Sequence, residues 1–365
     1  MITMFKNESK VIRRMLESCY KYIDYWVVQD NGSTDGSDQI VKDFFEEKGI
    51  PGHYYQCEEG WVGFGWNRDH LLQTCLNHDH GCDWILKMDC DEYLEVDDDF
   101  DWSLIDDTNI QSFHITAQNP GCTYYRAWMW NARLPWHFKH DVAHECIVCD
   151  IDGVGENFQR VDLPRGLRQM GTWDGESYAV PTKYISDSLN LEEQHIREGT
   201  LLTDTYHFWY VAKSYLDASY APIFPLGYEH QKEYARRAIF YFKSWLNFTI
   251  NYDEVGYTGG RNEMAYYTFY CIGEMYKLMG EYEKALESYM LAEPFCEIRN
   301  EHIVGLAETY RDIGDLESMR YQTERLIDPE RKLPFPDCFF LLNNTYYSDS
   351  GKYGKELHQI ACQAA

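Results

Sequence analysis

The first 91 residues alternate short apolar runs with amphipathic segments, and this alternation restricts the chain to one class of fold. Apolar runs typical of strands occupy residues 1–5, 25–29, 53–56 and 84–88. Helical patterns over residues 9–20, 38–48 and 67–76 separate them. Strands that alternate with helices predict a mostly parallel sheet covered by helices. Further apolar runs over residues 110–116, 123–130 and 143–149 predict a mixed second part of the same α/β domain.

After about Trp173 the pattern changes to long helices, and one internal repeat has a measurable period. Tyr276 and Gly280 recur as Tyr310 and Gly314, an offset of 34 residues. This is the period of tetratricopeptide helix pairs, which stack on neighbours to bury their apolar faces. We therefore predict two domains. An α/β domain over residues 1–173 is followed by an all-α domain with tetratricopeptide-like repeats over residues 174–365.

The charge of the chain disfavours two classes of partner. The formal net charge is −27, whereas binding to a nucleic-acid backbone needs clusters of Lys and Arg. Docking on anionic lipid is disfavoured for the same reason. Much of the acid falls between residues 91 and 107, where we expect a solvated surface loop.

The cysteines and the lack of long apolar runs indicate a reduced, cytoplasmic setting. The 12 cysteines are scattered rather than arranged as a disulfide framework. No apolar leader opens the sequence, and no run reaches the roughly 18 apolar residues of a membrane span. The pair Cys146-Ile-Val-Cys149 has no second pair at zinc spacing, so a buried strand explains it better than a metal or redox site.

Polar segments follow the predicted strands at positions where they can share one cleft. Asp89 and Asp91 come directly after the apolar run 84–88, and aspartates one residue apart point to the same side of an extended chain. Together they can hold a hard divalent cation, which in turn can hold a diphosphate. The carboxyl ends of parallel strands open on one edge of a sheet. The segments expected at this edge are residues 6–8, 30–36, 67–68 and 89–91.

The residue types in these segments suit a nucleotide. The glycines of residues 30–36 allow positive φ and close backbone approach. Asp30 can accept a hydrogen bond from a base-edge N–H, and Arg68 can meet a phosphate or a ribose.

In combination, these motifs resemble a known family. Lys6-Asn7-Glu8, residues 30–36 (Asp-Asn-Gly-Ser-Thr-Asp-Gly), Asn67-Arg68 and Asp89-Cys90-Asp91-Glu92 look like family 2 glycosyltransferases of the GT-A fold. More narrowly, they resemble the soluble branch with C-terminal tetratricopeptide-like helices. Residues 142–145 (Val-Ala-His-Glu) look like the Val-His-Glu signature of that branch. The resemblance covers roughly residues 1–330 and implies a Rossmann-like, mostly parallel mixed sheet.

The resemblance also implies a role for each motif residue. Asp30 would read a uracil-like base and Glu8 would contact the nucleoside, which makes a UDP-sugar the expected donor. Arg68 would meet the ribose or the diphosphate, and Asp89 would lie by the ribose and the metal. Mn²⁺ or Mg²⁺ would be bound by Asp89, Asp91 and His144. The full expected nucleotide-sugar site is Asn7, Glu8, Asp30, Asn31, Gly32, Asp35, Arg68 and Asp89.

The family implies transfer with inversion at the anomeric carbon, a step that needs a carboxylate base for the acceptor proton. Glu145 is the first candidate and Asp141 the second. We expect the acceptor to be either a glycan or a protein or peptide. The helical domain is expected either to position this acceptor or to mediate dimerisation. Two positions depart from the family pattern: Gln29 stands where an aliphatic residue is usual, and residues 131–142 match only loosely.

Two other classes of function compete with this interpretation. A non-catalytic tetratricopeptide-type scaffold with a relic nucleotide domain would explain the repeats. A nucleotidyltransferase would also use paired carboxylates on an α/β sheet. That class usually carries a glycine-rich basic loop after the first strand, and residues 6–8 contain no glycine.

Overall fold

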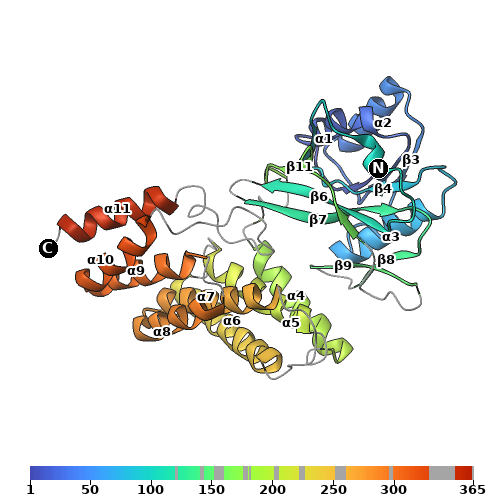
Figure 1. Ribbon diagram of the computed structural model, residues 1–365. Helices are drawn as coiled ribbons and strands as arrows, with labels where there is room; N and C mark the ends of the chain where they lie inside the picture. Colours follow the sequence, from blue (N-terminus) through green and yellow to red (C-terminus); the bar gives the residue numbers. More distant parts are fainter. Residues whose placement is uncertain are drawn as a thin grey trace. The chain divides into compact units, whose positions relative to one another are not determined.

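The computed structural model describes residues 1–119, 122–139, 144–151, 160–175, 180, 182–200, 205–221, 227–250, 260–295, 299–328 and 350–363. The chain forms two compact units, Met1–Val180 and Pro181–Ala365. The first contains all the described strands and the second is helical (Figure 1). The predicted order, an α/β domain followed by an all-α domain, is confirmed. The boundary predicted after residue 173 stays a prediction.

The first three strands form a parallel sheet. Strand β1 (Ile2–Phe5) pairs with β2 (Trp26–Asp30), and β2 pairs with β3 (Gly52–Gln56). On the other side of β1 lie the residues that follow β4 (Trp84–Leu86): Lys87 forms a parallel bridge with Ile2, and Met88 N donates to Ile2 O at 3.1 Å. The strand order therefore reverses at β1, which creates the kind of crevice where open α/β sheets bind ligands.

The remaining strands form a mixed sheet and a hairpin. Antiparallel pairing joins β4 to β7 and β7 to β6, and β6 pairs in parallel with β11 and β10. Strand β11 pairs antiparallel with β5, and β8 with β9. The bounds are β5 Glu92–Val96, β6 Ser112–Asn119, β7 Cys122–Asn131, β8 Trp136–Lys139, β9 Cys146–Cys149, β10 Arg160–Asp162 and β11 Leu167–Gly171.

Each face of the parallel strands has its own core, because neighbouring side chains of a strand point to opposite faces. Val28 packs with helices α1 (Ile12–Cys19) and α2 (Ser37–Lys48). Val27 packs on the other face with Leu71 and Leu72 of α3 (Phe64–Leu76), which β8 also contacts. Figure 1 shows α1 and α2 on one side of the strands and α3 on the other. Two short 3₁₀ helices, η1 (Tyr20–Tyr22) and η2 (Trp102–Ile105), complete the unit.

The prediction of a solvated loop over residues 91–107 is wrong for its first part. Glu92 and Leu94 of β5 are buried, since β5 pairs with β11 and Arg126 Nη1 donates to Glu92 Oε1 at 2.6 Å. A buried acid next to a neutralising arginine costs far less than an isolated one. The aspartates from Asp97 to Asp99 are exposed, as predicted.

The second unit consists of stacked helices. They are α4 (Lys183–Glu198), α5 (Thr205–Tyr220), α6 (Gly227–Ile250), α7 (Gly260–Leu278), α8 (Tyr282–Ala292), η4 (Glu293–Phe295), α9 (Glu301–Ile313), α10 (Leu316–Ile327) and α11 (Ser350–Gln363). The 34-residue repeat corresponds to the pairs α7–α8 and α9–α10. Its glycines, Gly280 and Gly314, follow α7 and α9 with φ of 78° and 83°, a left-handed conformation that commonly ends a helix.

Within the described ranges, we find no helix with the length and the apolar character needed to cross a membrane.

Candidate functional site

The loops after β1 and β2 are tied together by side chains of both. Asn7 N donates to Ser33 Oγ at 3.0 Å, and Thr34 N donates to Asn7 Oδ1 at 2.8 Å. Asp35 accepts from Ser9 N at 2.9 Å and from Ser37 N at 3.0 Å. Asp35 therefore links the loops after β1 and β2 through hydrogen bonds. Its predicted contact with the nucleotide stays a prediction.

Asp30, at the end of β2, is 2% exposed and already well bonded. Its Oδ1 accepts from Gly32 N at 3.1 Å and Ser33 N at 2.8 Å, and its Oδ2 accepts from Tyr54 Oη at 3.0 Å. Gly32 has φ +89°, which allows the turn that brings its N–H back to Asp30. The carboxylate therefore shapes the turn next to the expected nucleotide.

Behind this turn lies a buried amide network that explains Gln29. Its Nε2 donates to Asn31 Oδ1 at 2.7 Å, and its Oε1 accepts from Tyr55 Oη at 2.5 Å. Asn67 Nδ2 donates to the same Asn31 Oδ1 at 2.9 Å and to Gly60 O at 2.8 Å. Asn31 Nδ2 is buried without a partner among the described residues. Such an unpaired donor is uncommon in a folded protein, where most buried polar groups have a partner.

Asp89 is held by cations on two sides. Arg68 Nη2 donates to Asp89 Oδ1 and Oδ2, each at 3.2 Å, and Lys87 Nζ donates to Oδ2 at 2.8 Å. Burial opposes ionisation, but Lys87 and Arg68 hold the pKa of Asp89 well below its usual value. Lys87 is 3% exposed, and burial, with repulsion from Arg68, lowers its pKa to about 7.

Glu92 and Arg126 extend the network across β7. Asp89 N donates to Glu92 Oε2 at 3.1 Å, and Arg126 lies over the Trp128 ring, 4.0 Å from its centroid. Lys87 Nζ lies 3.3 Å from the centroid of the same ring. Burial is the main cause that raises the pKa of the Glu92 carboxyl group.

Asp91 lies in a contrasting environment. Burial, followed by repulsion from Asp89, raises the pKa of its carboxyl group. No Lys or Arg nitrogen of the described residues lies within ion-pair distance of it. A Cβ added to Gly175 would lie 3.1 Å from Asp91 Cβ and 3.5 Å from Glu8 Oε1, so both acids border Gly175.

The segment after β11 holds the backbone of Asp91 in place through hydrogen bonds. Thr172 N and Oγ1 donate to Asp91 O at 3.0 and 2.7 Å. Asp174 is paired with Arg14 of α1 at 2.7 Å. Residues 171–175, remote in sequence, thus help to set the position of the Asp91 backbone.

Glu145 lies next to Arg68, the partner of Asp89, and forms an ion pair with it. Its side chain is 6% exposed. His144 precedes it with φ +61°. Asp141, the second candidate base, lies outside the described residues.

Three described non-glycine residues have positive φ: Asn7, His144 and Trp173, at 59°, 61° and 54°. All three are in segments that border this site. Bulky residues rarely adopt such angles, and strained backbone is often found at functional sites.

Of the two acids of the Asp-x-Asp motif, Asp91 is suited to bind a divalent cation and Asp89 is already paired with cationic side chains. Asp91 is a half-buried carboxylate without a counter-cation among the described residues, next to Glu8, which suits a hard cation. Asp89 is engaged by Arg68 and Lys87. Among the residues that the structure describes, no group of three or more His, Cys, Asp or Glu is arranged as a metal site.

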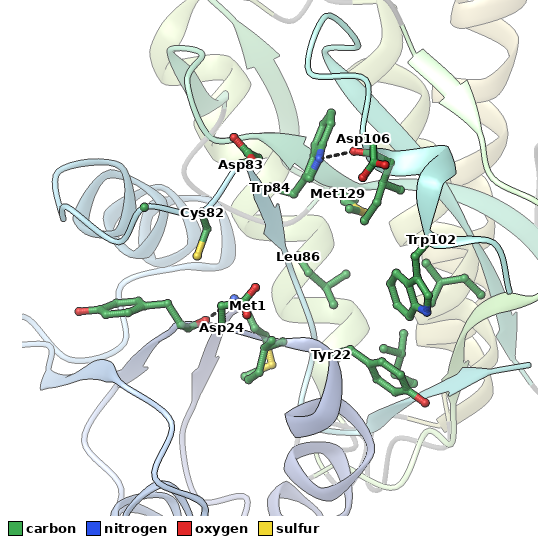
Figure 2. A pocket seen from close by; sticks show the side chains of 16 residues that line it. Met1, Tyr22, Asp24, Cys82, Asp83, Trp84, Leu86, Trp102, Asp106 and Met129 are labelled. Carbon is green, nitrogen blue, oxygen red and sulfur yellow. Dashed lines mark hydrogen bonds between the residues drawn. The ribbon is translucent and has the colours of Figure 1, made fainter. Parts of the chain in front are cut away.

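A separate cavity of about 370 Å³ opens near the amino ends of β1 and β2 (Figure 2). Its lining is apolar around Met1, Leu86 and Met129, and Tyr22 stacks on Trp102 at its side with ring centroids 5.3 Å apart. None of the predicted site residues lines it, so it is distinct from the candidate site.

The site residues missed from the sequence are Lys87, Glu92, Arg126 and the segment 171–175. For Lys87 a signal existed, since it is the one charge in the apolar run 84–88. Arg126 and Thr172 carry no local signal, because they reach the site only through the pairing of β7 with β4 and of β11 with β5.

Comparison with known proteins gives one family match and several distant structural likenesses. Residues 1–100 match the family model "Glycosyl transferase family 2". No curated protein matches in sequence.

Three solved structures illustrate the structural likenesses. MamA is 11% identical, with 50% of this chain and 84% of that chain covered, and a TM-score of 0.31. TTC0263, a thermophilic TPR protein in Thermus thermophilus, is 17% identical, with 41% and 84% covered and a TM-score of 0.26. The mannosyltransferase PcManGT from Pyrobaculum calidifontis, in complex with GDP-Man and Mn²⁺, is 16% identical, with 68% and 82% covered and a TM-score of 0.31. Likenesses this distant carry no argument about activity.

The family match covers the loops after β1 and β2, the start of α3 and the Asp-x-Asp segment. The resemblance drawn from the motifs is therefore confirmed over this range: residues 1–100 carry a glycosyl transferase family 2 domain.

Proposed function

We propose that the first unit is a metal-dependent, inverting glycosyltransferase that takes a nucleotide-sugar, a UDP-sugar in the first instance, and glycosylates a glycan or a protein or peptide. The observation that carries the proposal is the meeting of four sequence segments at the β1–β4 crevice. There Asp91 remains a half-buried carboxylate without a counter-cation in the described part of the chain.

The charges at the crevice support a need for a divalent cation. Three cations, Arg68, Lys87 and Arg126, are matched by three carboxylates, Asp89, Glu92 and Glu145. Asp91 then remains as a carboxylate without a counter-cation among the described residues, and its charge would repel a diphosphate. A divalent cation on Asp91 reverses that charge and, when bound, stabilises the departing diphosphate.

We assign the nucleoside to the loop after β2, with Asn31 and Gly32 among its contacts. The turn at Gly32 is partly exposed, which leaves its backbone accessible. Asn7, Glu8, Asp30 and Asp35 hold the two loops around it. His144 is proposed to complete the metal shell from the segment before β9.

Glu145 remains the first candidate for the base, and its pairing suggests how it is controlled. An arginine partner stabilises the ionised carboxylate and makes it a weaker base. A bound diphosphate would compete for Arg68 and release Glu145, so that the base becomes stronger when donor is present. Asp141 remains the second candidate.

The test is calorimetric binding of UDP, GDP, dTDP and CDP, each with and without Mn²⁺, to the wild type and to Asp91→Asn. We expect one nucleotide to bind only with Mn²⁺ and this binding to fall at least tenfold in the variant. Asp98→Asn, on the exposed loop after β5, is the matched control and should bind like the wild type.

Asp91→Asn removes a half-buried charge that has no counter-cation among the described residues, so it should fold at least as well as the wild type. Loss of binding would then not reflect unfolding. Absence of binding for all four nucleotides to a folded wild type would refute the proposal and favour the binding scaffold.

A further inference from the structure

Lys87 stands where the apolar run before the Asp-x-Asp motif would be expected to continue. It is 3% exposed, and burying a lysine is unfavourable unless its ammonium group is paired. Its Nζ donates to Asp89 Oδ2 at 2.8 Å and lies 3.3 Å from the centroid of the Trp128 ring. The lysine is thus fixed between an acid and an aromatic face.

The two acids of the motif therefore have opposite surroundings. Arg68 contacts both oxygens of Asp89, and Lys87 contacts one of them. Asp91 has no such cation within the described part of the chain, and it borders Gly175 and Glu8 instead. A divalent cation that approached Asp89 would either have to displace the side chains of Arg68 and Lys87 or be repelled by their positive charges.

We infer that Lys87 is a positioning residue that keeps Asp89 out of the coordination shell of the divalent cation. Asp91 is then the carboxylate of the motif that binds the cation, and Asp89 instead orients Arg68 toward the donor diphosphate. This inference rests on the proposed function and revises the expectation that both acids bind the metal.

The two roles separate because a carboxylate can either bind a cation or hold the arginine in place. Without Lys87, Asp89 would keep only Arg68 as a partner and could turn one oxygen toward the cation. Binding of the free cation would then strengthen, because two carboxylates hold it in place of one. Binding of the diphosphate would weaken, because Arg68 loses its orientation.

The experiment measures Mn²⁺ affinity without nucleotide, by calorimetry, in the wild type, Lys87→Met, Asp89→Asn and the double variant. Methionine conserves the volume of the lysine stem and packs well on an aromatic ring. We expect Lys87→Met to bind Mn²⁺ about tenfold more tightly and the double variant to lose this gain. UDP or GDP, whichever binds the wild type with Mn²⁺, should bind Lys87→Met at least tenfold more weakly.

Two further variants serve as controls. Lys48→Met removes a lysine that also contacts an acid, Glu47 at 3.0 Å, and lies 4.7 Å from the Tyr20 ring centroid, away from the crevice. It should leave Mn²⁺ affinity unchanged. Lys87→Arg keeps a cation next to Asp89 and should behave like the wild type. A gain in Mn²⁺ affinity by Lys87→Met itself requires a folded site, so a folding defect would not be mistaken for it.

The outcomes distinguish this inference from the proposed function. A gain in Mn²⁺ affinity that survives Asp89→Asn would be a simple charge effect and would overturn the inference. An unchanged affinity in Lys87→Met would also overturn it, while leaving nucleotide binding by the wild type intact. A wild type that binds neither Mn²⁺ nor any nucleotide would refute both.

Discussion

At the scale of single residues, Asp89 and Asp91 show that the environment, not the residue type, sets the chemistry of a carboxylate. Burial would raise the pKa of both groups. For Asp89 the cations Lys87 and Arg68 overcome burial and lower the pKa, whereas for Asp91 the charge of Asp89 adds to burial and raises it. Two acids one residue apart are therefore prepared for different tasks.

Asp35 gives a prediction about stability and pH. Burial opposes the shift, but hydrogen bonds from Ser37 and Ser9 lower the pKa of Asp35 to about 2. Its unfolded pKa is about 3.9. Because the folded value is the lower one, the stabilisation is complete well above pH 4 and is lost as the pH falls toward 2.

We expect Asp35→Ala to lower the free energy of unfolding by about 1–2 kcal/mol at pH 7, since it removes bonds to two backbone amides. Urea unfolding at pH 6 and pH 3 checks this, and the difference from the wild type should shrink at pH 3. An equal difference at both pH values would contradict the role given to the ionised carboxylate. Asp98→Ala is the exposed control.

At the scale of elements, the sequence predicts those strands and helices whose burial follows a simple period. Strands β1 and β2 and helices α1–α3 are predicted because Val27, Val28 and their neighbours are apolar and fully covered. Strand β11 contains Arg168 and the buried Gln169, whose Nε2 donates to Lys87 O at 2.7 Å. Its stability comes from partners that are remote in sequence, in β5, in β6 and at Lys87, so no local period reveals it.

The candidate site follows the same division. The motifs indicate Asp30, Asp89 and Asp91, which follow or end strands, and Arg68, which lies near the start of α3. The pairing of Arg68 with Glu145 and the contact of Gly175 with Asp91 depend on how distant segments fold together. Local sequence does not contain that information.

The packing of α7, α8 and α9 supplies a prediction for an element. A Cβ added to Gly273 of α7 would lie 2.5 Å from Tyr289 Cε1, and one added to Gly305 of α9 would lie 2.6 Å from it. The ring of Tyr289 therefore fits between two helices only because both positions are glycine.

Alanine favours a helix over glycine by about 1 kcal/mol, yet we expect Gly305→Ala to destabilise the protein by about 1–3 kcal/mol through overpacking. The measurement is chemical denaturation of the wild type, Gly305→Ala, Tyr289→Leu and the double variant. The cost of Gly305→Ala should shrink in the Tyr289→Leu background, as expected for residues in contact. A stabilised Gly305→Ala protein would show that helix propensity outweighs the clash.

At the scale of the whole molecule, the chain contains two units with separate cores. The first buries its residues on both faces of the β1–β3 strands, and the second buries Tyr289, Ala307 and their neighbours between helices. All residues of the candidate site belong to the first unit. The two units are therefore expected to respond differently to ligand and to mutation.

We predict two transitions in differential scanning calorimetry of the full chain. Mn²⁺ with the nucleotide that binds should shift only the transition of the first unit, by about 2.7 kcal/mol of added stability at 100 times the dissociation constant. Gly305→Ala should lower only the other transition, and Asp91→Asn should abolish the ligand shift while leaving both transitions in place. If ligand moved both transitions together, the units would unfold cooperatively, and the helical unit would then be coupled energetically to donor binding.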